Sequence, residues 1–369
     1  MSEQPVFTQD LLDRCISCGF CLSSCPTYGL TGSETSSPRG RIELMRALQD
    51  GRLAEDDPTL REESEFCLGC RACEPVCPAG VQYGTLLEEW RDRTWTPGRR
   101  PLRLRGLLWL VNRRWRVQML GLLRRHARRR HACRPQACRP HARTSGSDEP
   151  VSLMLGCFER ALFPSVSRSA SKLVPNARIP ARQSCCGALH AHNGELERGR
   201  ELAVALGEEL PGTIVTTSGG CAAHLSSVLG RERVRELSDW LAEQGGELPT
   251  APSRRLRVAL QDSCHLRNGI GVWRQPRDLI REVADYVELE SAAACCGAAG
   301  SYSILRKHDS NAILDTKLDE IAALDLDYVV AVNPGCLRQL QQGLRRRGLR
   351  TRAVHLAEFL TEAKITPGS

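Results

Sequence analysis

The sequence predicts a multidomain protein of mixed α+β and α/β structure, in which an α-helical, cysteine-rich amino-terminal part precedes two repeated α/β modules. Three observations support this prediction. Two dense cysteine groups lie between residues 15 and 77, short apolar runs alternate with amphipathic stretches from Val151 onward, and one cysteine pattern occurs twice in the second half. The chain has 369 residues and is 41% hydrophobic, which is enough for two or three domains with buried cores.

Composition divides the chain into four parts. Residues 1–95 hold the dense cysteine groups, residues 96–150 are arginine-rich and predict an amphipathic helix and a linker, and 151–250 and 255–365 are the two modules. The opening MSEQPVFTQD is acidic, and no apolar run approaches the roughly 18 residues of a membrane-spanning helix. We therefore expect a cytoplasmic protein without a secretory signal, either free or peripheral on the inner face of the cell membrane.

The first element is the pair of cysteine groups CISCGFCLSSCP (15–26) and CLGCRACEPVCP (67–78). Both have the spacing C-x2-C-x2-C-x3-C-P, in which three thiolates bind three corners of a [4Fe–4S] cluster and the fourth binds the other cluster. Structural zinc is the alternative, but it usually uses two separated C-x2-C pairs. We predict a ferredoxin-type domain with two [4Fe–4S] clusters. The ligand sets are Cys15, Cys18, Cys21 and Cys77 for the first cluster, and Cys67, Cys70, Cys73 and Cys25 for the second.

Eighteen cysteines in a reducing compartment favour metal or redox chemistry over a disulfide framework. Between the two groups, SPRGRIELMRAL (37–48) predicts a turn and a helix that carries Arg39 and Arg41 near one cluster. Positive charge there would favour the reduced, more negative state of a cluster. The alternative, which we weight equally, is that both arginines lie at a solvent-exposed helix start and do not affect a cluster.

The arginine-rich segment carries the positive charge of the chain, with seventeen arginines and one acid between Arg91 and Arg143. Three interpretations of its helix over 102–125 compete: docking on a partner subunit, lying in the interface of an anionic membrane, or contact with nucleic acid. The remainder of the chain is acidic, so we expect no nucleic-acid partner. Cys133 and Cys138 lie in a low-complexity stretch, and we interpret them as having no metal-binding role. The predicted apolar stripe comprises Leu104, Leu107, Leu108, Val111, Trp115, Met119 and Leu122, with Leu102, Trp109, Leu110 and Leu120 off it.

The second half predicts α/β units with parallel sheets, because buried strands alternate with helical patterns. The strands are expected at 151–155, 213–217, 257–261 and 328–332, and helices at 194–209, 275–285 and 310–324. Four landmarks recur in the same order, which indicates two homologous modules. Cys157 recurs as Cys264, Cys185-Cys186-Gly187 as Cys295-Cys296-Gly297, Cys221 as Cys336, and LSDWL (237–241) as LAEFL (356–360).

The eight cysteines of these CCG modules are further candidates for a metal or redox role: Cys157, Cys185, Cys186 and Cys221, then Cys264, Cys295, Cys296 and Cys336. The alternative is that they are buried thiols that pack as small hydrophobic side chains. Packing alone does not explain Cys-Cys-Gly at matching places in both modules. His190, His192, His224 and His265 lie nearby and are expected to orient loops rather than to bind metal.

Five motifs together resemble the iron–sulfur subunits of bacterial glycolate oxidase, within the wider CCG-domain, heterodisulfide-reductase-like family. They are CISCGFCLSSCPTYGLTGSETSSPRGRI, CLGCRACEPVCPAGV, QDSCHLRNGIG, CCGAAGSY and NPGCLRQL. Heterodisulfide reductase modules use a fifth cysteine for an unusual non-cubane cluster. Here Ser218 and Asn333 stand at that position, which argues against that cluster and against disulfide-reductase chemistry.

The resemblance implies an electron-transfer subunit of a flavin-dependent 2-hydroxy-acid (glycolate) dehydrogenase, with FAD on partner subunits and a quinone-type acceptor. The sequence has no dinucleotide fingerprint, no flavin-binding pattern and no nucleophile paired with a base, so we expect no catalytic residue on this chain alone. The alternatives are an iron–sulfur subunit of lactate utilisation or of anaerobic glycerol-3-phosphate dehydrogenase, a heterodisulfide-reductase-like thiol or disulfide catalyst, and a nucleic-acid-binding protein with structural clusters.

Overall fold

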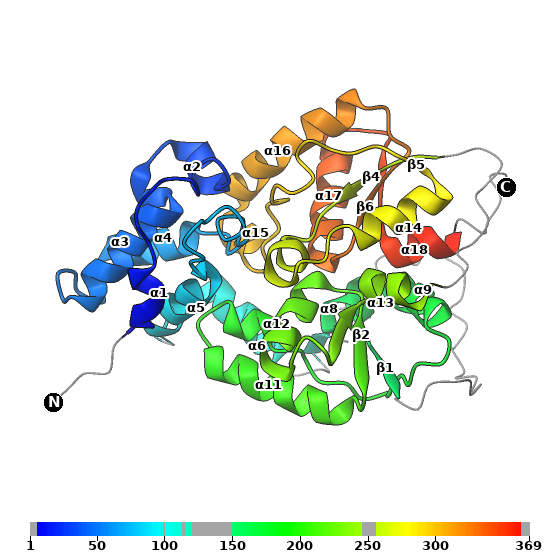
Figure 1. Cartoon of the computed structure of the whole chain (residues 1–369), viewed down its shortest axis with the longest axis horizontal. Helices are drawn as coiled ribbons and strands as arrows, with labels where there is room; N and C mark the ends of the chain where they lie inside the picture. The colour runs from blue at the N-terminus through cyan, green and yellow to red at the C-terminus, as the bar shows by residue number, and fades with distance from the viewer. Residues whose placement is uncertain are drawn as a thin grey trace.

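A computed structural model describes residues 6–96, 98, 100–112, 116, 117, 119, 150–245 and 256–362. A helical amino-terminal part lies at one end, and two α/β modules lie side by side next to it (Figure 1). The strands of both modules form parallel sheets. The coarse prediction of a mixed helix and strand protein with two similar α/β regions is therefore confirmed.

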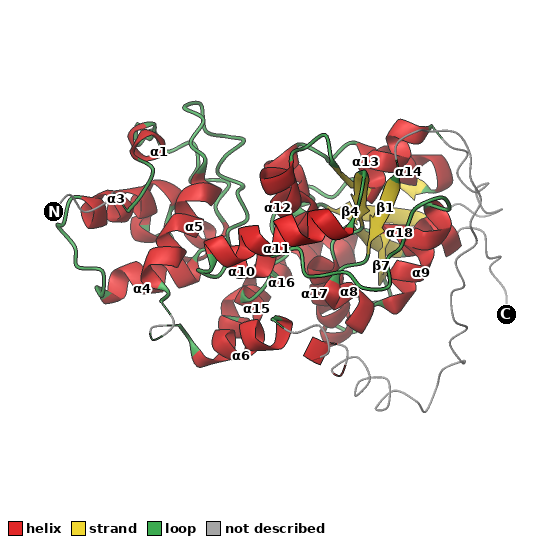
Figure 2. Ribbon diagram, turned by 90° about the horizontal axis from the view of Figure 1, so that it is seen from below, coloured by secondary structure: helices red, strands yellow, loops and turns green. Residues whose placement is uncertain are grey.

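The amino-terminal part is helical, and its described residues 6–96 contain no strand (Figure 2). Three helices begin at a proline, a residue that is well placed in the first turn because it has no N–H to leave unpaired. Two are also capped: Ser37 Oγ accepts from the Gly40 amide at 3.0 Å, and Asp57 Oδ1 accepts from the Thr59 amide at 2.8 Å. The helices are α1 (Gln9–Asp13), α2 (Pro26–Thr31), the 3-10 helix η1 (Glu34–Ser36), α3 (Pro38–Gln49), α4 (Pro58–Phe66) and α5 (Tyr83–Thr94).

This part has its own core, in which Met45, Leu60, Leu86 and Trp90 are fully buried. The cysteine loops are attached to that core, because Cys67 belongs to it and Cys15, Cys73 and Cys77 pack against its surface. The helix predicted within 37–48 corresponds to α3, and the 3-10 helix η1 ends directly before that range.

Helix α6 (Leu102–Val111) buries its apolar stripe inside this chain. Leu104, Leu108 and Val111 are buried and pack with Phe158 and Leu305 of the two modules. The expectation that this stripe docks on a partner or a membrane is therefore wrong for residues 104–111, because the chain itself covers the stripe. Leu102 and Trp109, which lie off the stripe, are 78% and 59% exposed. Met119 is also exposed, whereas Trp115, Leu120, Leu122, Cys133 and Cys138 lie outside the described residues.

The first module contains a three-stranded parallel sheet in the order β1-β2-β3. Val151 of β1 lies opposite Thr213 of β2, and Ile214 lies opposite Val234 of β3. The predicted strands at 151 and 213 and the helix near 194–209 are present, whereas β3 was not expected. The elements are β1 (Val151–Met154), α8 (Cys157–Leu162), α9 (Pro164–Leu173), α10 (Ala188–Ala191), α11 (Leu196–Glu209), β2 (Thr213–Thr216), α12 (Gly219–Leu229), β3 (Val234–Glu236) and α13 (Leu237–Gln244).

The second module contains a four-stranded parallel sheet in the order β5-β4-β6-β7. Val258 of β4 lies between Tyr286 of β5 and Tyr328 of β6. The two predicted strands and both predicted helices are present, and β5 and β7 are additional. The elements are β4 (Arg257–Gln261), the π-helical turn η2 (His265–Gly269), α14 (Gln275–Val283), β5 (Asp285–Tyr286), α15 (Tyr302–Leu305), α16 (Lys307–Ala323), β6 (Tyr328–Ala331), α17 (Pro334–Arg346), β7 (Arg352–His355) and α18 (Leu356–Glu362).

The two modules share one hydrophobic core. Leu153 and Val215 of the first sheet and Ala259 and Val329 of the second belong to a single cluster of buried residues. Polar contacts also cross the joint, by which we mean the interface between the two modules. The Gly219 amide donates to the Val332 carbonyl oxygen at 3.2 Å. The modules are therefore packed together as one body.

Candidate iron–sulfur sites

The first cysteine-lined hollow has a volume of about 430 Å³, its open mouth included. Three of its thiols come from the first cysteine group, and two, Cys73 and Cys77, come from the second. Cys18 is exposed, and the neighbouring side chains of Ile16 and Phe20 are 70% and 66% exposed. The thiols in its wall are Cys15, Cys18, Cys21, Cys73 and Cys77.

The second hollow has a volume of about 310 Å³ and lies deeper in the protein. Its lining includes Cys67 and Cys70, which are buried, and Cys73 from the same group, with Cys25 from the first group. Each hollow is thus bordered by three thiols of one group and by the last cysteine of the other group, and Cys73 is an additional thiol of the first hollow. The four thiols of each predicted ligand set line one hollow, although Cys73 borders both.

Both cysteine loops reverse direction at equivalent places. The residues on both sides of the second cysteine of each group have left-handed backbone, and one of each pair is glycine, for which this conformation has no steric cost. The reversal curls each loop, so that cysteines three residues apart border one hollow. The four residues are Ser17 (φ 54°), Gly19 (φ 88°), Gly69 (φ 64°) and Arg71 (φ 59°).

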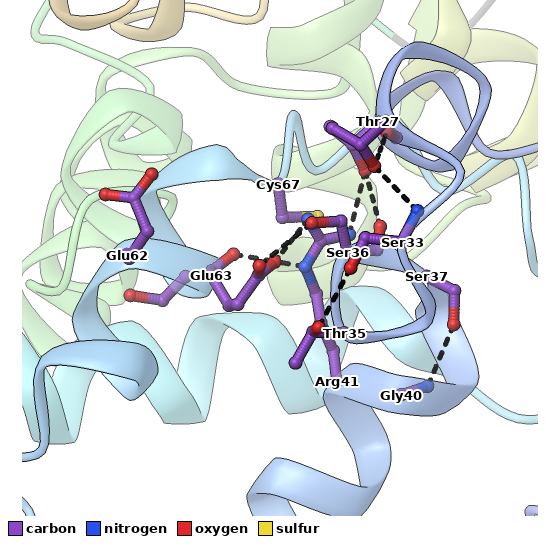
Figure 3. A network of polar contacts seen from close by, with 12 residues as sticks. Thr27, Ser33, Thr35, Ser36, Ser37, Gly40, Arg41, Glu62, Glu63 and Cys67 are labelled. Atoms are coloured by element: carbon purple, nitrogen blue, oxygen red, sulfur yellow. Dashed lines mark hydrogen bonds and ion pairs between the residues drawn. The ribbon is translucent and has the colours of Figure 1, made fainter.

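A buried arginine, Arg41, lies beside the second hollow (Figure 3). Its Nη2 pairs with Glu63 Oε2 at 3.0 Å, and its Nη1 donates to Thr27 Oγ1 at 3.0 Å. Thr27 Oγ1 is also 3.2 Å from Cys25 Sγ. Burial opposes the charge of Arg41, but negative charge at Cys67 and other neighbours more than offsets it, so its pKa lies above the ordinary value. A permanent positive charge is therefore fixed next to these thiols.

Arg39 lies beside the first hollow instead. It lines that hollow, pairs with Glu34 Oε1 at 2.6 Å and donates to the Ser17 carbonyl oxygen at 2.8 Å. The expectation that Arg39 and Arg41 lie near one cluster site is therefore wrong, because side chains two residues apart on α3 point to different hollows. The sequence also gave no indication that Tyr83 contacts a cysteine of the second group. Its hydroxyl donates to Cys67 Sγ at 3.7 Å.

The four thiols of the first CCG module meet at the carboxyl ends of its strands. Cys157 follows β1 and Cys221 lies in the first turn of α12 after β2, a place where parallel sheets commonly bind ligands. Cys157 and Cys185 are 3.9 Å apart, and Cys186 donates to Cys221 at 3.1 Å. Hydrogen bonds from Cys157 and Cys186 hold the pKa of Cys185 well below its ordinary value.

The second module repeats this arrangement, with Cys264 after β4 and Cys336 at the start of α17. Cys264 packs against the buried cluster that contains Cys295, and Cys296 and Cys336 belong to one cluster of buried residues. The neighbouring thiols of Cys295 and Cys336 hold the pKa of Cys296 well below its ordinary value, and the buried Lys317 acts in the same direction. All sixteen cysteines within the described ranges are free thiols.

The described residues contain no group of three or more His, Cys, Asp or Glu side chains that could hold a single metal ion. The hollows differ from such a site, because a [4Fe–4S] cluster takes one thiolate at each of four separate corners. Each hollow has in its wall the three neighbouring thiols and the distant thiol that such a donor set requires, and the first hollow also has Cys73.

Comparison with known proteins agrees with this geometry. Residues 11–81 match the family model of the 4Fe-4S dicluster domain, and residues 151–226 and 258–341 match that of the Cysteine-rich domain. The probable glycolate oxidase iron-sulfur subunit of Bacillus subtilis (strain 168) is 37% identical over 415 residues, which cover 95% of this chain and 93% of that protein. The chain belongs to the family of glycolate oxidase iron–sulfur subunits.

Other relatives cover the chain to different extents. The glycolate oxidase iron-sulfur subunit of Escherichia coli (strain K12) is 27% identical over 395 residues, covering 96% of this chain and 94% of that protein. Lactate utilization protein A 2 of Bacillus cereus is 25% identical over 236 residues, covering 58% of this chain and 98% of that protein. Similarity to the glycolate oxidase subunits thus extends over nearly the whole chain, which confirms the resemblance drawn from the motifs.

In this member of the glycolate oxidase iron–sulfur family, several histidines meet where the helical part joins both modules. His192 Nδ1 is 2.6 Å from Glu88 Oε1, and its ring lies 4.8 Å from that of His265 and 6.2 Å from that of His224. Burial opposes ionisation of Glu88, but the hydrogen bond from His192 lowers its pKa to about 2. Burial lowers the pKa of His265 to about 3. No sequence pattern pointed to Glu88, which lies 104 residues from its partner.

His190 instead contacts Glu195 Oε2 at 2.5 Å within the first module. The described contacts of these histidines therefore connect loops and helices, as expected from the sequence. None of the described helices has both the length and the apolar character needed to cross a membrane.

Proposed function

We propose that this chain is the electron-transfer subunit of a flavin-dependent glycolate dehydrogenase and that it holds two [4Fe–4S] clusters in a ferredoxin-type domain. The proposal is supported chiefly by the crossed lining of the two hollows, where Cys77 joins the first cysteine group and Cys25 joins the second. Cys15, Cys18, Cys21 and Cys77 would hold one cluster, and Cys67, Cys70, Cys73 and Cys25 the other. Such clusters supply one-electron transfer when bound.

The residues of this chain would bind the two clusters and influence their reduction potentials. Arg41 and the Tyr83 hydroxyl place positive charge and a hydrogen bond beside the second set of thiolates, which favours an additional electron there. Substrate oxidation would take place on partner subunits that carry FAD, and a quinone would accept the electrons that leave this chain.

The first hollow is the proposed docking site of a flavin-bearing subunit. It opens at the surface beside Cys18, and the exposed Ile16 and Phe20 at its rim offer apolar contact area to a partner. Replacing Ile16 and Phe20 by serine should weaken assembly with the flavin subunits and slow electron transfer from them. The iron content should stay unchanged. If this variant assembles normally, the flavin subunits dock on another surface of the chain.

The outward face of α6 is the proposed contact with an anionic membrane. Leu102 and Trp109 are seven residues apart and exposed, and Arg116 stacks on Trp109 with its Cζ 3.7 Å from the ring centroid. Apolar side chains with arginines between them suit an anionic lipid interface. Vesicles that contain phosphatidylglycerol should retain the chain, phosphatidylcholine vesicles should not, and the variant with Leu102→Ser and Trp109→Ser should lose retention.

Iron and acid-labile sulfide, measured with electron paramagnetic resonance on anaerobically purified chain, test the main proposal. Two clusters require about eight irons per chain, and appreciably more would mean that the CCG modules are also loaded. Glycolate oxidation should require the flavin subunits. Turnover by this chain alone, or a zinc-filled and iron-poor protein, would contradict the proposal.

A thiol or disulfide catalyst at the CCG modules is the second candidate, and the lowered pKa of Cys185 favours it because thiolates are the reactive form. Reduction of a model disulfide that is lost on Cys185→Ala and on Cys186→Ala but kept on Cys18→Ala would support this function. Lactate in place of glycolate as the substrate of the complex is tested by turnover of the assembled subunits with each acid.

A further inference from the structure

Both cysteine loops are held by an arginine at the same place. The first cysteine of each group accepts, at its backbone carbonyl oxygen, a hydrogen bond from an arginine of the helical part. Arg46 Nη2 of α3 donates to the Cys15 carbonyl oxygen at 2.7 Å, and Arg91 Nη2 of α5 donates to that of Cys67 at 2.6 Å. Cys15 lines the first hollow and Cys67 lines the second, so one arginine lies directly behind the wall of each hollow.

The two arginines differ in their surroundings. The side chain of Arg46 is 26% exposed, and its Nη1 pairs with Glu43 Oε1 at 2.6 Å. Arg91 is only 7% exposed, and its other hydrogen bonds also end at backbone carbonyl oxygens. Its Nε and Nη2 donate to Ser64 at 3.1 and 2.8 Å, and its Nη1 donates to His192 of the first module at 2.9 Å. Carbonyl oxygens satisfy the N–H groups of Arg91 but bring no negative charge.

No carboxylate in the described part of the chain forms an ion pair with Arg91. Glu88, the acid one turn earlier on α5, contacts His192 Nδ1 at 2.6 Å instead. The guanidinium lies over Trp95, with Cζ 4.9 Å from the ring centroid, and this contact is weaker than an ion pair. Arginine stays protonated in proteins, and a buried charge without a counter-charge is strongly unfavourable. The surroundings of Arg91 therefore suit an anion that the protein itself does not supply.

The second hollow is the place for that anion. The two arginines in its wall each have a carboxylate partner: Arg41 pairs with Glu63 at 3.0 Å, and Arg71 pairs with Glu74 at 2.8 Å. A [4Fe–4S] cluster with four thiolates has a net negative charge, which increases by one on reduction, and charge near a cluster is among the factors that set its potential. Arg91 thus brings to this hollow a buried positive charge that no carboxylate of the described residues offsets.

We propose that Arg91 is a positioning residue for the second cluster, and that its buried, unpaired charge makes reduction easier at the second hollow than at the first. The inference rests on the proposed function. An electron that enters at the first hollow, beside the exposed Cys18, would then leave the first cluster oxidised and reduce the second. Arg46 has no equal effect on the first cluster, because Glu43 and solvent offset its charge.

The test is a redox titration of the full chain, purified without oxygen and followed by electron paramagnetic resonance. Arg91→Gln removes the charge but keeps an N–H donor, whereas Arg91→Lys keeps the charge with a different donor geometry. We expect reduction of the second cluster to become about tenfold less favourable in Arg91→Gln, a shift of about 59 mV for one electron. Arg91→Lys should stay close to the unchanged chain, and the potential of the first cluster should not move in either variant.

Arg46→Gln is the matched control behind the first hollow and should shift the first potential much less than Arg91→Gln shifts the second. Loss of the second cluster from Arg91→Gln but not from Arg91→Lys would also support the inference, because the charge would then be needed to hold the cluster. Equal potentials and equal iron contents in the two Arg91 variants would overturn it and leave the proposed function intact. Absence of iron from the unchanged chain would instead overturn the proposed function.

Discussion

Ser218 Oγ donates a hydrogen bond to Asn333 Oδ1 at 3.0 Å, and these two residues occupy equivalent positions in the two modules. Each precedes the helix that carries the last cysteine of its module, α12 or α17. The bond therefore lies on the joint between the modules, next to the backbone contact of Gly219 with Val332. Positions where heterodisulfide reductase modules have a cysteine are used here to attach one module to the other.

The Ser218–Asn333 pair should show coupling in a double-mutant cycle. Ser218→Ala and Asn333→Ala should each lower the free energy of unfolding by about 1–2 kcal/mol, because both partners lie in a mostly buried joint. The double variant should cost less than the sum, by about 1 kcal/mol, since the shared bond is removed only once. Urea unfolding of the four proteins measures this, and additive losses would show that the two side chains do not interact in solution.

Arg41 should be far more important for stability than Arg39, although both come from the same helix. Arg41→Met leaves Glu63 buried without its counter-charge, and breaking such a pair typically costs about 3–5 kcal/mol, so we expect a loss of that size. Arg39→Met should leave stability nearly unchanged because its pair with Glu34 is exposed to solvent. Anaerobic denaturant titrations compare the two variants. Adding Glu63→Gln to Arg41→Met should recover part of the loss, and a failure to recover would point to Arg41 packing as the cause.

Stability should fall as the pH rises toward neutrality because of Glu159. Burial raises the pKa of this carboxyl from 4.5 to about 7, although hydroxyls of Ser167 and Thr217 donate to it. A raised pKa means that the folded state holds the proton more tightly than the unfolded state. The contribution is therefore complete below pH 4.5 and is lost as the pH passes 7, with a total of about 3 kcal/mol.

Glu159→Gln should flatten the pH dependence of the free energy of unfolding between about pH 5 and 7.5, since the amide does not ionise. Burial also raises the pKa of Glu236 to about 7, so this carboxyl is a second, independent group. Glu236→Gln should therefore remove a similar part of the pH dependence. Unfolding curves across this pH range give the slope for each variant. An unchanged slope in both single variants would contradict the assignment.

Patterns local in sequence predicted much of this structure. The spacing of the cysteines anticipated the crossed lining of both hollows, and apolar runs located four strands. Two of the missed strands, β3 and β5, have only three and two residues, too few for a clear periodic signal. The third, β7, is as long as the located β1, but its sequence RAVH lacks a continuous apolar run.

Contacts between distant segments could not be predicted from these patterns. The stripe of α6 was recognised as amphipathic, but periodicity does not say which surface covers it, and Phe158 and Leu305 of the modules do so. The Cys70–Asn268 and Glu88–His192 contacts join residues more than 100 positions apart. Each depends on how the helical part packs against the modules, which only the folded chain reveals.

The crossed lining makes a specific prediction for the last cysteine of each group. Cys77→Ala should remove the cluster of Cys15, Cys18 and Cys21 and leave that of the second group, because Cys77 borders the first hollow. Cys25→Ala should have the opposite effect, because Cys25 borders the second hollow beside Thr27 and Arg41. Each variant should hold about four irons where the unchanged chain holds about eight.

Spectroscopy decides which cluster has been lost. Cys18 lies only in the wall of the first hollow and Cys67 only in that of the second, so the signal that survives in Cys77→Ala should be lost on Cys67→Ala, and the one that survives in Cys25→Ala should be lost on Cys18→Ala. Cys186→Ala, a matched thiol deletion in the first module, should leave both signals in place. If Cys77→Ala removes the signal that depends on Cys67, Cys70 and Cys73, each group keeps its own fourth ligand. The two hollows would then be filled without exchange between the groups.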